Sequence, residues 1–267
     1  MDTIDTNVQW DAAVYAENNA MQGQQINRFF FNRISWKSTE NVLDIGCADG
    51  QRTAYIAQLT PHGNVVGWDI SPSMLSHASQ QYPQSAFPNL TFKMVDATHF
   101  DSYTNDPSRF DLVTAFHSLH WMDNQQEILN GIHHVLKPGG RAYIYVVSKG
   151  QDPIQSAADQ LIASEKWSSY FKNFKDPIHR YTVEEYTALL NEAGLSVVSI
   201  DDVVETDYMA SRTELEQQIV SWLPHLKVLD AESQNLFLKD MIDLMVGPAN
   251  GPFYLIDSNL EVIAQKP

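Results

Sequence analysis

The sequence predicts an α/β fold in which helices cover both faces of a mostly parallel sheet. Apolar segments of strand length alternate with helix-like segments between residues 41 and 148. This alternation is typical of parallel strands joined by helical crossovers, and such strands are apolar because both faces of the sheet are covered. Several of these apolar segments also run directly into a turn that carries glycine or an acid, a pattern that predicts a ligand site at one edge of the sheet.

Composition narrows the classes of function. The chain has 267 residues, of which 43% are hydrophobic and 11% aromatic, enough for a packed core. Lys and Arg total 17 against 33 Asp and Glu, so the formal charge is −16. An acidic surface repels phosphate backbones and anionic lipids, and we therefore expect no nucleic-acid and no membrane partner.

The cellular location and the cysteine chemistry are predicted from targeting patterns and from the number of cysteines. Its beginning, MDTIDTNVQW, has neither the basic region nor the apolar stretch of a signal peptide, and no apolar run approaches membrane-spanning length. We expect a cytoplasmic protein. The single cysteine excludes an intrachain disulfide and a four-thiolate zinc site.

The first half of the chain supplies most of the expected elements. Strands are predicted over residues 41–46, 64–70, 90–97, 110–118 and 141–148, and helices over 11–34, 51–59, 71–82 and 124–136. Ser71 is a natural N-cap for its helix, and Pro72 fits the first helical position, where no N–H is needed. The sequence 137-KPGG-140 is predicted to close the helix that precedes it.

The second half is less regular. Thr182 and Glu185 have the spacing of a capping box, which predicts a helix that ends near Gly194. Further segments are a strand over 195–208, a strand or a strand pair about Asp257 and Ser258 over 253–267, a mainly helical region 210–249 and a polar-aromatic insert 150–181. The two late strands need a sheet to join, which favours one domain overall; two independent domains remain an alternative.

The turn 44-DIGCADG-50 indicates the kind of ligand. Two glycines let the backbone approach a ligand, but Ala48 and the missing third glycine do not fit a dinucleotide-binding loop, and a phosphate-binding Gly-Lys-Ser/Thr is also absent. The ligand is therefore expected to be a nucleoside without phosphate. Asp69 closes the second strand, where it could accept the ribose hydroxyls, and Asp96 closes the third, where it could accept from an adenine amino group. Either acid could instead only cap its loop.

These segments together resemble a known family. The motifs VLDIGCADG, VVGWDISPSML, MVDA, FDLVTAFHSLHW and LKPGGRAYI occur in order over about residues 38–148 and are similar to class I S-adenosylmethionine-dependent methyltransferases. The resemblance implies a Rossmann-like, seven-stranded, mostly parallel sheet with helical cap insertions. It also implies S-adenosyl-L-methionine as cofactor and S-adenosyl-L-homocysteine as product. On this basis we expect an N-terminal helical lid (1–37), a cofactor-binding core (38–150) and a C-terminal part (151–267) that completes the sheet.

The resemblance implies a set of cofactor-binding residues at the strand ends and on the N-terminal helix. They are Tyr15, Asp44, Gly46, Cys47, Ala48, Gly50, Asp69, Ile70, Met74, Asp96, Ala97, Phe116 and His117.

A closer resemblance concerns the acceptor. The segments 12-AAVYAENNAMQ-22 and 119-LHWMDNQ-125 are similar to juvenile hormone acid methyltransferases, and trans-aconitate methyltransferases share the residue pair that ends in Trp121. This implies that Gln22 and Trp121 hold a substrate carboxylate. Alternatively, Trp121 is a packing anchor and the helical face with Tyr15 and Gln22 only packs on the sheet. His117 and His120 have no third ligand nearby, so no metal is expected.

The predicted activity is O-methylation of the carboxylate of a small, largely apolar acid. A carboxylate is already ionised at pH 7 and needs no general base. A polyanion would need several converging basic residues, and those after residue 148 are interspersed with aromatic ones. The alternatives are a hydroxyl or amine acceptor with His120 as base, or a catalytically silent S-adenosylmethionine-binding protein. The sequence leaves the oligomeric state, monomer or homodimer, open.

Overall fold

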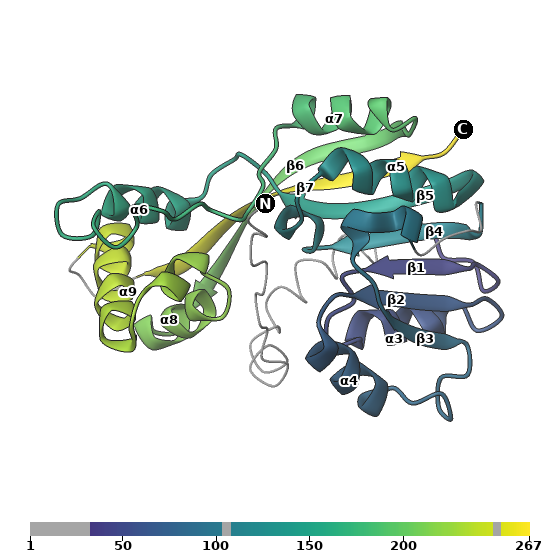
Figure 1. Cartoon of the computed structure of the whole chain (residues 1–267), viewed down its shortest axis with the longest axis horizontal. Coiled ribbons are helices and arrows are strands. Elements are labelled where there is room, and N and C mark those ends of the chain that lie inside the picture. The colour runs from purple at the N-terminus through teal and green to yellow at the C-terminus, as the bar shows by residue number, and fades with distance from the viewer. Residues whose placement is uncertain (1–32, 103–107, 248–251) are drawn as a thin grey trace.

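The computed structural model describes residues 33–102, 108–247 and 252–267 (Figure 1). These residues form a seven-stranded sheet in the order β3-β2-β1-β4-β5-β7-β6. The strands are β1 Val42–Ile45, β2 Val65–Asp69, β3 Leu90–Met94, β4 Phe110–Phe116, β5 Leu136–Val147, β6 Ser196–Met209 and β7 Phe253–Gln265. β7 runs antiparallel to both of its neighbours, β5 and β6, and the pairs among β1 to β5 are parallel. This is the predicted mostly parallel sheet, and β7 completes it as the last strand in the chain.

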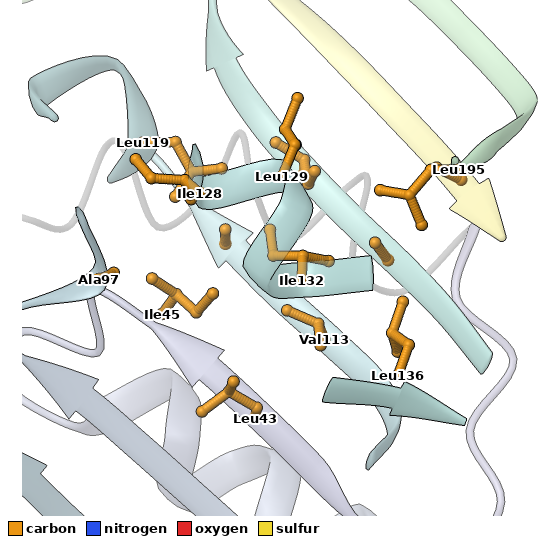
Figure 2. Packing of buried hydrophobic residues seen from close by; sticks show 14 of the residues in the cluster. Leu43, Ile45, Ala97, Val113, Leu119, Ile128, Leu129, Ile132, Leu136 and Leu195 are labelled. Carbon is orange, nitrogen blue, oxygen red and sulfur yellow. The ribbon is translucent and has the colours of Figure 1, made fainter. Parts of the chain in front are cut away.

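The helices cover both faces, as expected for strands that are apolar on both sides. The core helices are α3 Gln51–Leu59, α4 Pro72–Gln81, α5 Gln125–Val135 and α7 Val183–Glu192. Ile128 and Ile132 of α5 pack over Leu43 of β1 and Val113 of β4 (Figure 2). A second cluster joins α3 to the opposite face and includes Ile56.

Local signals in the sequence explain where the helices begin. The Ser71 hydroxyl accepts the Met74 N–H at 3.4 Å, and Pro72 is the first residue of α4. The predicted capping box is present at α7, where the Thr182 hydroxyl and the Glu185 carboxylate each accept the other residue's backbone N–H. Side-chain caps of this kind satisfy N–H groups that have no partner within the helix.

The cap helices lie apart from the sheet, at the far ends of β6 and β7 (Figure 1). They are α6 Pro153–Ile162, α8 Arg212–Val220 and α9 Ala231–Val246, with the 3₁₀ turn η3 Pro224–Val228. Pairing with β5 stops at Asn259 of β7, so the segment 253–258 of β7 pairs with β6 alone. This two-stranded ribbon carries the caps, which have a hydrophobic cluster of their own that includes Phe237 and Met241.

Some expected boundaries differ from the structure. Residues 253–265 form one continuous strand, so the alternative of a strand pair about Asp257 and Ser258 is wrong. Strand β3 ends at Met94, which leaves Asp96 two residues beyond it. The 137-KPGG-140 segment is part of β5, with a register shift against β4.

Other expectations are not tested. The predicted helix 11–34 falls almost wholly, and the lid 1–37 mostly, outside the described residues, and the division into one domain with caps stays a prediction. No helix in the described part of the chain is long and apolar enough to cross a membrane.

Candidate active site

The loop after β1 makes a tight turn over residues 46–50, which we call the cradle. Gly46, Ala48 and Gly50 all have positive φ, at 75°, 47° and 79°. A Cβ at Gly46 would lie 2.2 Å from the Ser118 Cβ, so only glycine fits between β1 and the end of β4. The Ser118 hydroxyl donates to the Ile45 carbonyl at 2.7 Å and fixes this contact. The backbone therefore curves tightly at the carboxyl end of β1, where open α/β sheets bind ligands.

Asp44, in β1 just before the cradle, holds the surrounding elements together by hydrogen bonds. Its carboxylate accepts the hydroxyls of Thr53 in α3 at 2.6 Å and of Thr114 in β4 at 2.7 Å. Burial raises the pKa of Asp44, and these two hydrogen bonds oppose that effect. The predicted residue thus ties β1, β4 and α3 together directly beneath the loop.

Asp69 lies at the end of β2 and faces the same loop. Its two oxygens accept the backbone N–H of Ala48 at 2.9 Å and of Ser71 at 2.8 Å. Burial raises its pKa, while the backbone hydrogen bonds lower it. A carboxylate has about four lone-pair sites, so Asp69, which interacts with the backbone N–H groups of Ala48, Ser71 and Ile70, keeps capacity to accept from a ribose hydroxyl.

The residues around Asp69 divide into exposed and buried ones. Ile70 follows it with 57% of its surface exposed, an apolar side chain available to pack against a flat ring. Met74 is 2% exposed and Ala97 is 4% exposed, so both contribute to packing. Their predicted contact with cofactor stays a prediction.

Asp96 caps the turn that follows β3. Its Oδ1 accepts the Thr98 N–H at 2.9 Å and the Thr98 hydroxyl at 2.6 Å, and its Oδ2 lies 3.1 Å from the His99 Nδ1. Partial burial favours a higher pKa for Asp96, but the hydrogen bonds outweigh it and the pKa is lowered. The loop-capping interpretation therefore describes what Asp96 does here, and its adenine contact stays a prediction.

A shallow hollow that is open to solvent lies beside the cradle. It is lined by Asp44, Gly46, Cys47, Ala48, Asp49, Gln51, Arg52 and Phe116. Five of these were predicted cofactor residues.

Cys47 is 5% exposed, and burial, with Asp69 and Asp44 nearby, raises the pKa of its thiol well above the usual range. The thiol is protonated and unreactive at neutral pH.

Two imidazoles follow the end of β4. His117 has a positive φ of 51°, and its ring lies 5.7 Å from that of His120, edge to face. His117 Nε2 and His120 Nδ1 are buried without a hydrogen-bond partner among the described residues. Burial lowers the pKa of His117 to about 3 and lowers that of His120 well below its usual value. Both rings are therefore neutral at pH 7.

Trp121 lies beside this pair, half-buried, with its ring 5.7 Å from that of His120. A segment that leads into α7 holds the region in place. The His179 N–H donates to the His120 carbonyl at 2.8 Å, and its Nε2 lies 2.9 Å from the Asp123 carboxylate. The predicted partners Tyr15 and Gln22 lie outside the described residues, so their contact with this region is not tested.

The residues present fit an adenosyl-sulfonium cofactor. The cradle lies at the carboxyl end of β1 and lines the hollow, Asp69 keeps capacity to accept from a hydroxyl, and Ile70 offers exposed apolar surface. The loop is not positively charged in the way that phosphate binding requires, since Asp49 and Asp69 oppose Arg52. Among the described residues, no three side chains of His, Cys, Asp or Glu come together as metal ligands.

Sequence reasoning missed two participants. Arg52 lines the hollow from the first turn of α3, and its charge contributes to the lowered pKa of His117. Tyr145 of β5 contacts the His117 ring, with ring centroids 4.8 Å apart. Arg52 lies two residues beyond the glycine turn and could have been found from that spacing, whereas the contact of Tyr145 depends on the sheet register.

The comparisons with known proteins agree with this fold and site. The model of the methyltransferase domain family matches residues 36–194, which is more than half of the chain. The chain therefore belongs to the methyltransferase domain family, in the class that uses S-adenosylmethionine as methyl donor.

Several individual proteins are similar to the chain. Juvenile hormone acid O-methyltransferase of Drosophila melanogaster is 27% identical over 249 residues, which cover 88% of this chain and 82% of that protein. Trans-aconitate 2-methyltransferase of Escherichia coli is 26% identical over 237 residues and covers 86% of each chain. Among solved structures, phosphoethanolamine N-methyltransferase 2 of Haemonchus contortus, in complex with S-adenosylhomocysteine, superposes with a TM-score of 0.58 at 18% identity. That superposition covers 96% of this chain and 57% of the other, and shows a shared fold.

Proposed function

We propose that the protein transfers the methyl group of S-adenosylmethionine to the carboxylate of a small, largely apolar acid. The observation that carries this proposal is the state of the two imidazoles at the end of β4. His120 is buried and His117 is partly buried with its Nε2 shielded from solvent, and both have pKa values below their usual range. The His120 ring lies 5.7 Å from that of Trp121, and the His117 ring 5.7 Å from that of His120.

A general base works best when its pKa lies near the working pH. When bound, S-adenosylmethionine supplies an electrophilic methyl group on a sulfonium. An alcohol or ammonium acceptor would have to lose a proton, and a buried imidazole with a lowered pKa accepts it poorly. A carboxylate has a reference pKa of about 4 and arrives ionised at pH 7. The residues then only need to align the acceptor and exclude water.

The charges of the caps favour an acceptor with one carboxylate over a polyanion. Three basic residues that could converge on an anion are already paired with acids. These pairs are Lys149–Glu185 at 2.6 Å, Arg180–Asp176 at 2.8 Å and Arg212–Asp243 at 2.6 Å. A tricarboxylate would have to compete with these carboxylates for the same cations.

The similarity to juvenile hormone acid and trans-aconitate methyltransferases supports an acid acceptor. Within this proposal, Gln22 and Trp121 are the donors that orient the carboxylate. Neutral donors hold it without cancelling the charge that makes it nucleophilic. The His120 ring, packed against Trp121, helps to set the direction of the indole.

The experiment is a methyl-transfer screen that detects product by mass. The acceptors are fatty, isoprenoid and aromatic acids, tested beside amines, phenols and trans-aconitate. We expect methyl esters of one or more of the apolar acids. The variant Gln22→Ala/Trp121→Ala should lose at least about tenfold in kcat/KM for the acid. Products only from amines, phenols or trans-aconitate would overturn the proposed acceptor, and no product from any of them would favour a silent binding protein.

A His120→Gln variant separates an ionised acceptor from one that needs a base. Glutamine keeps a polar side chain of similar reach but cannot take up a proton. With an acid acceptor, turnover should stay within about threefold of the wild type, whereas loss of a general base costs about 10²-fold or more.

A further inference from the structure

A buried hydrogen bond links two strands beneath the imidazoles. The Tyr145 hydroxyl of β5 donates to the Glu205 carboxylate of β6 at 3.1 Å. Tyr145 is fully buried, and Glu205 is 8% exposed. Glu205 lies in the ribbon part of β6, opposite Asp257 of β7, where pairing with β5 has already ended. The bond therefore connects the rigid sheet to the ribbon that carries the caps.

Tyr145 also supports His117 directly. The two rings are 4.8 Å apart at an angle of 69°, the edge-to-face arrangement that aromatic rings prefer. The His117 N–H donates to the Tyr145 carbonyl at 2.9 Å. His117 adopts a left-handed backbone conformation that is unfavourable for residues other than glycine. Such a conformation persists only where neighbouring contacts enforce it, and Tyr145 provides two of those contacts.

The phenol is the donor in this hydrogen bond at neutral pH. Burial raises the pKa of Tyr145, and Glu205, Glu261 and Asp257 raise it further, so the phenol keeps its proton and remains the donor.

We propose that Tyr145 and Glu205 are positioning residues for methyl transfer, holding the His117 ring and the strained backbone between the cofactor hollow and the acceptor side. Phe116, which precedes His117, lines the hollow, while His120 and Trp121 follow on the acceptor side. A shift of His117 would therefore move the backbone that separates the hollow from the acceptor side. This positioning role requires the geometry of the hydrogen bond and does not require the negative charge of Glu205.

Four variants test the proposal. Tyr145→Phe removes the hydroxyl and keeps the ring, Glu205→Gln keeps an acceptor oxygen and removes the charge, and Glu205→Ala removes both. Tyr143→Phe is the matched control, because Tyr143 is a buried phenol two residues earlier on the same strand whose hydroxyl accepts a hydrogen bond from Arg141 at 3.2 Å.

The first readout needs no acceptor. Imidazole nitrogen NMR, with the His117 signals assigned through His117→Gln, reports the ring environment, and calorimetry reports S-adenosylhomocysteine binding. We expect the His117 signals to shift in Tyr145→Phe and Glu205→Ala and to stay in place in Tyr143→Phe and Glu205→Gln. Binding of S-adenosylhomocysteine should remain within about threefold of the wild type in all four variants, since Tyr143, Tyr145 and Glu205 do not line the hollow.

The second readout is turnover of lauric acid and rests on the proposed function. Tyr145→Phe and Glu205→Ala should lower kcat about tenfold, as small misplacements at reacting groups do, and Glu205→Gln should restore it. If Glu205→Gln is as impaired as Glu205→Ala, or if the His117 signals do not move in Tyr145→Phe, the positioning role is wrong. If the wild type does not turn over lauric acid, that acceptor is wrong, and the NMR result still decides the positioning role.

Discussion

At the scale of single residues, burial sets the chemistry of the site more than charge pairing does. The same effect raises the pKa of the acids Asp44 and Asp69 and lowers that of His117 and His120. The imidazoles thus stay neutral beside the acceptor side, where a positive charge would repel the sulfonium of the cofactor.

The lowered histidine pKa predicts how stability depends on pH. In the unfolded chain His117 binds a proton below pH 6.5, while in the folded protein it does so only near pH 3. Between these values the unfolded state binds more protons, so the free energy of unfolding decreases as the pH falls. From pH 7.5 to 5.0, His117 should account for a loss of about 2 kcal/mol.

Urea unfolding at the two pH values measures this loss. His117→Gln should lose about 2 kcal/mol less than the wild type between them. His62→Gln, which removes an exposed imidazole, is the control and should behave like the wild type. An identical pH dependence for His117→Gln and wild type would contradict a neutral His117 with a lowered pKa.

At the scale of elements, local sequence signals predicted most of the core. Strand and helix positions, the Ser71 cap and the Thr182 capping box all depend on residues close together in the chain. The bond between Tyr145 and Glu205 joins residues 60 apart in sequence, and it depends on β6 extending beyond the sheet. No local pattern encodes that extension. The exact end of β3 was missed because Val95 continues the apolar run after pairing has ended.

The turn after β1 gives a test at this scale. Gly46 and Gly139 have nearly the same φ, 75° and 78°, but a Cβ at Gly46 would lie 2.2 Å from Ser118, whereas the nearest atom at Gly139 is 4.0 Å away. Gly139→Ala should cost only the backbone strain, about 1–2 kcal/mol. Gly46→Ala should cost a further 1–3 kcal/mol or so from overpacking.

Denaturant unfolding of the two alanine variants gives the difference in the free energy of unfolding. Equal losses at both sites would mean that the contact with Ser118 relaxes freely and that the cradle is not fixed as described.

At the scale of the whole molecule, the strand order brings separate parts of the chain to one edge. The strand order reverses between β1 and β4. The chain leaves β1 for α3 on one face of the sheet and leaves β4 for α5 on the other face, and a crevice forms between these two loops. The ribbon of β6 and β7 then carries the cap helices away from the sheet (Figure 1). Of the acids predicted at the strand ends, Asp44 and Asp69 come together at this edge, because Asp69 accepts the Ala48 N–H of the loop that follows β1.

The most direct test of this account is calorimetric binding of S-adenosylhomocysteine to the wild type, Asp69→Ala and Asp111→Ala. Asp111 is the control, since it lies near the start of β4, at the opposite edge of the sheet, where Lys137 binds it at 2.8 Å. We expect the wild type and Asp111→Ala to bind alike, and Asp69→Ala to bind about tenfold or more weakly, as loss of a charge-assisted hydrogen bond predicts. Equal binding by Asp69→Ala, or no binding by the wild type, would contradict a cofactor site at the carboxyl ends of β1 and β2.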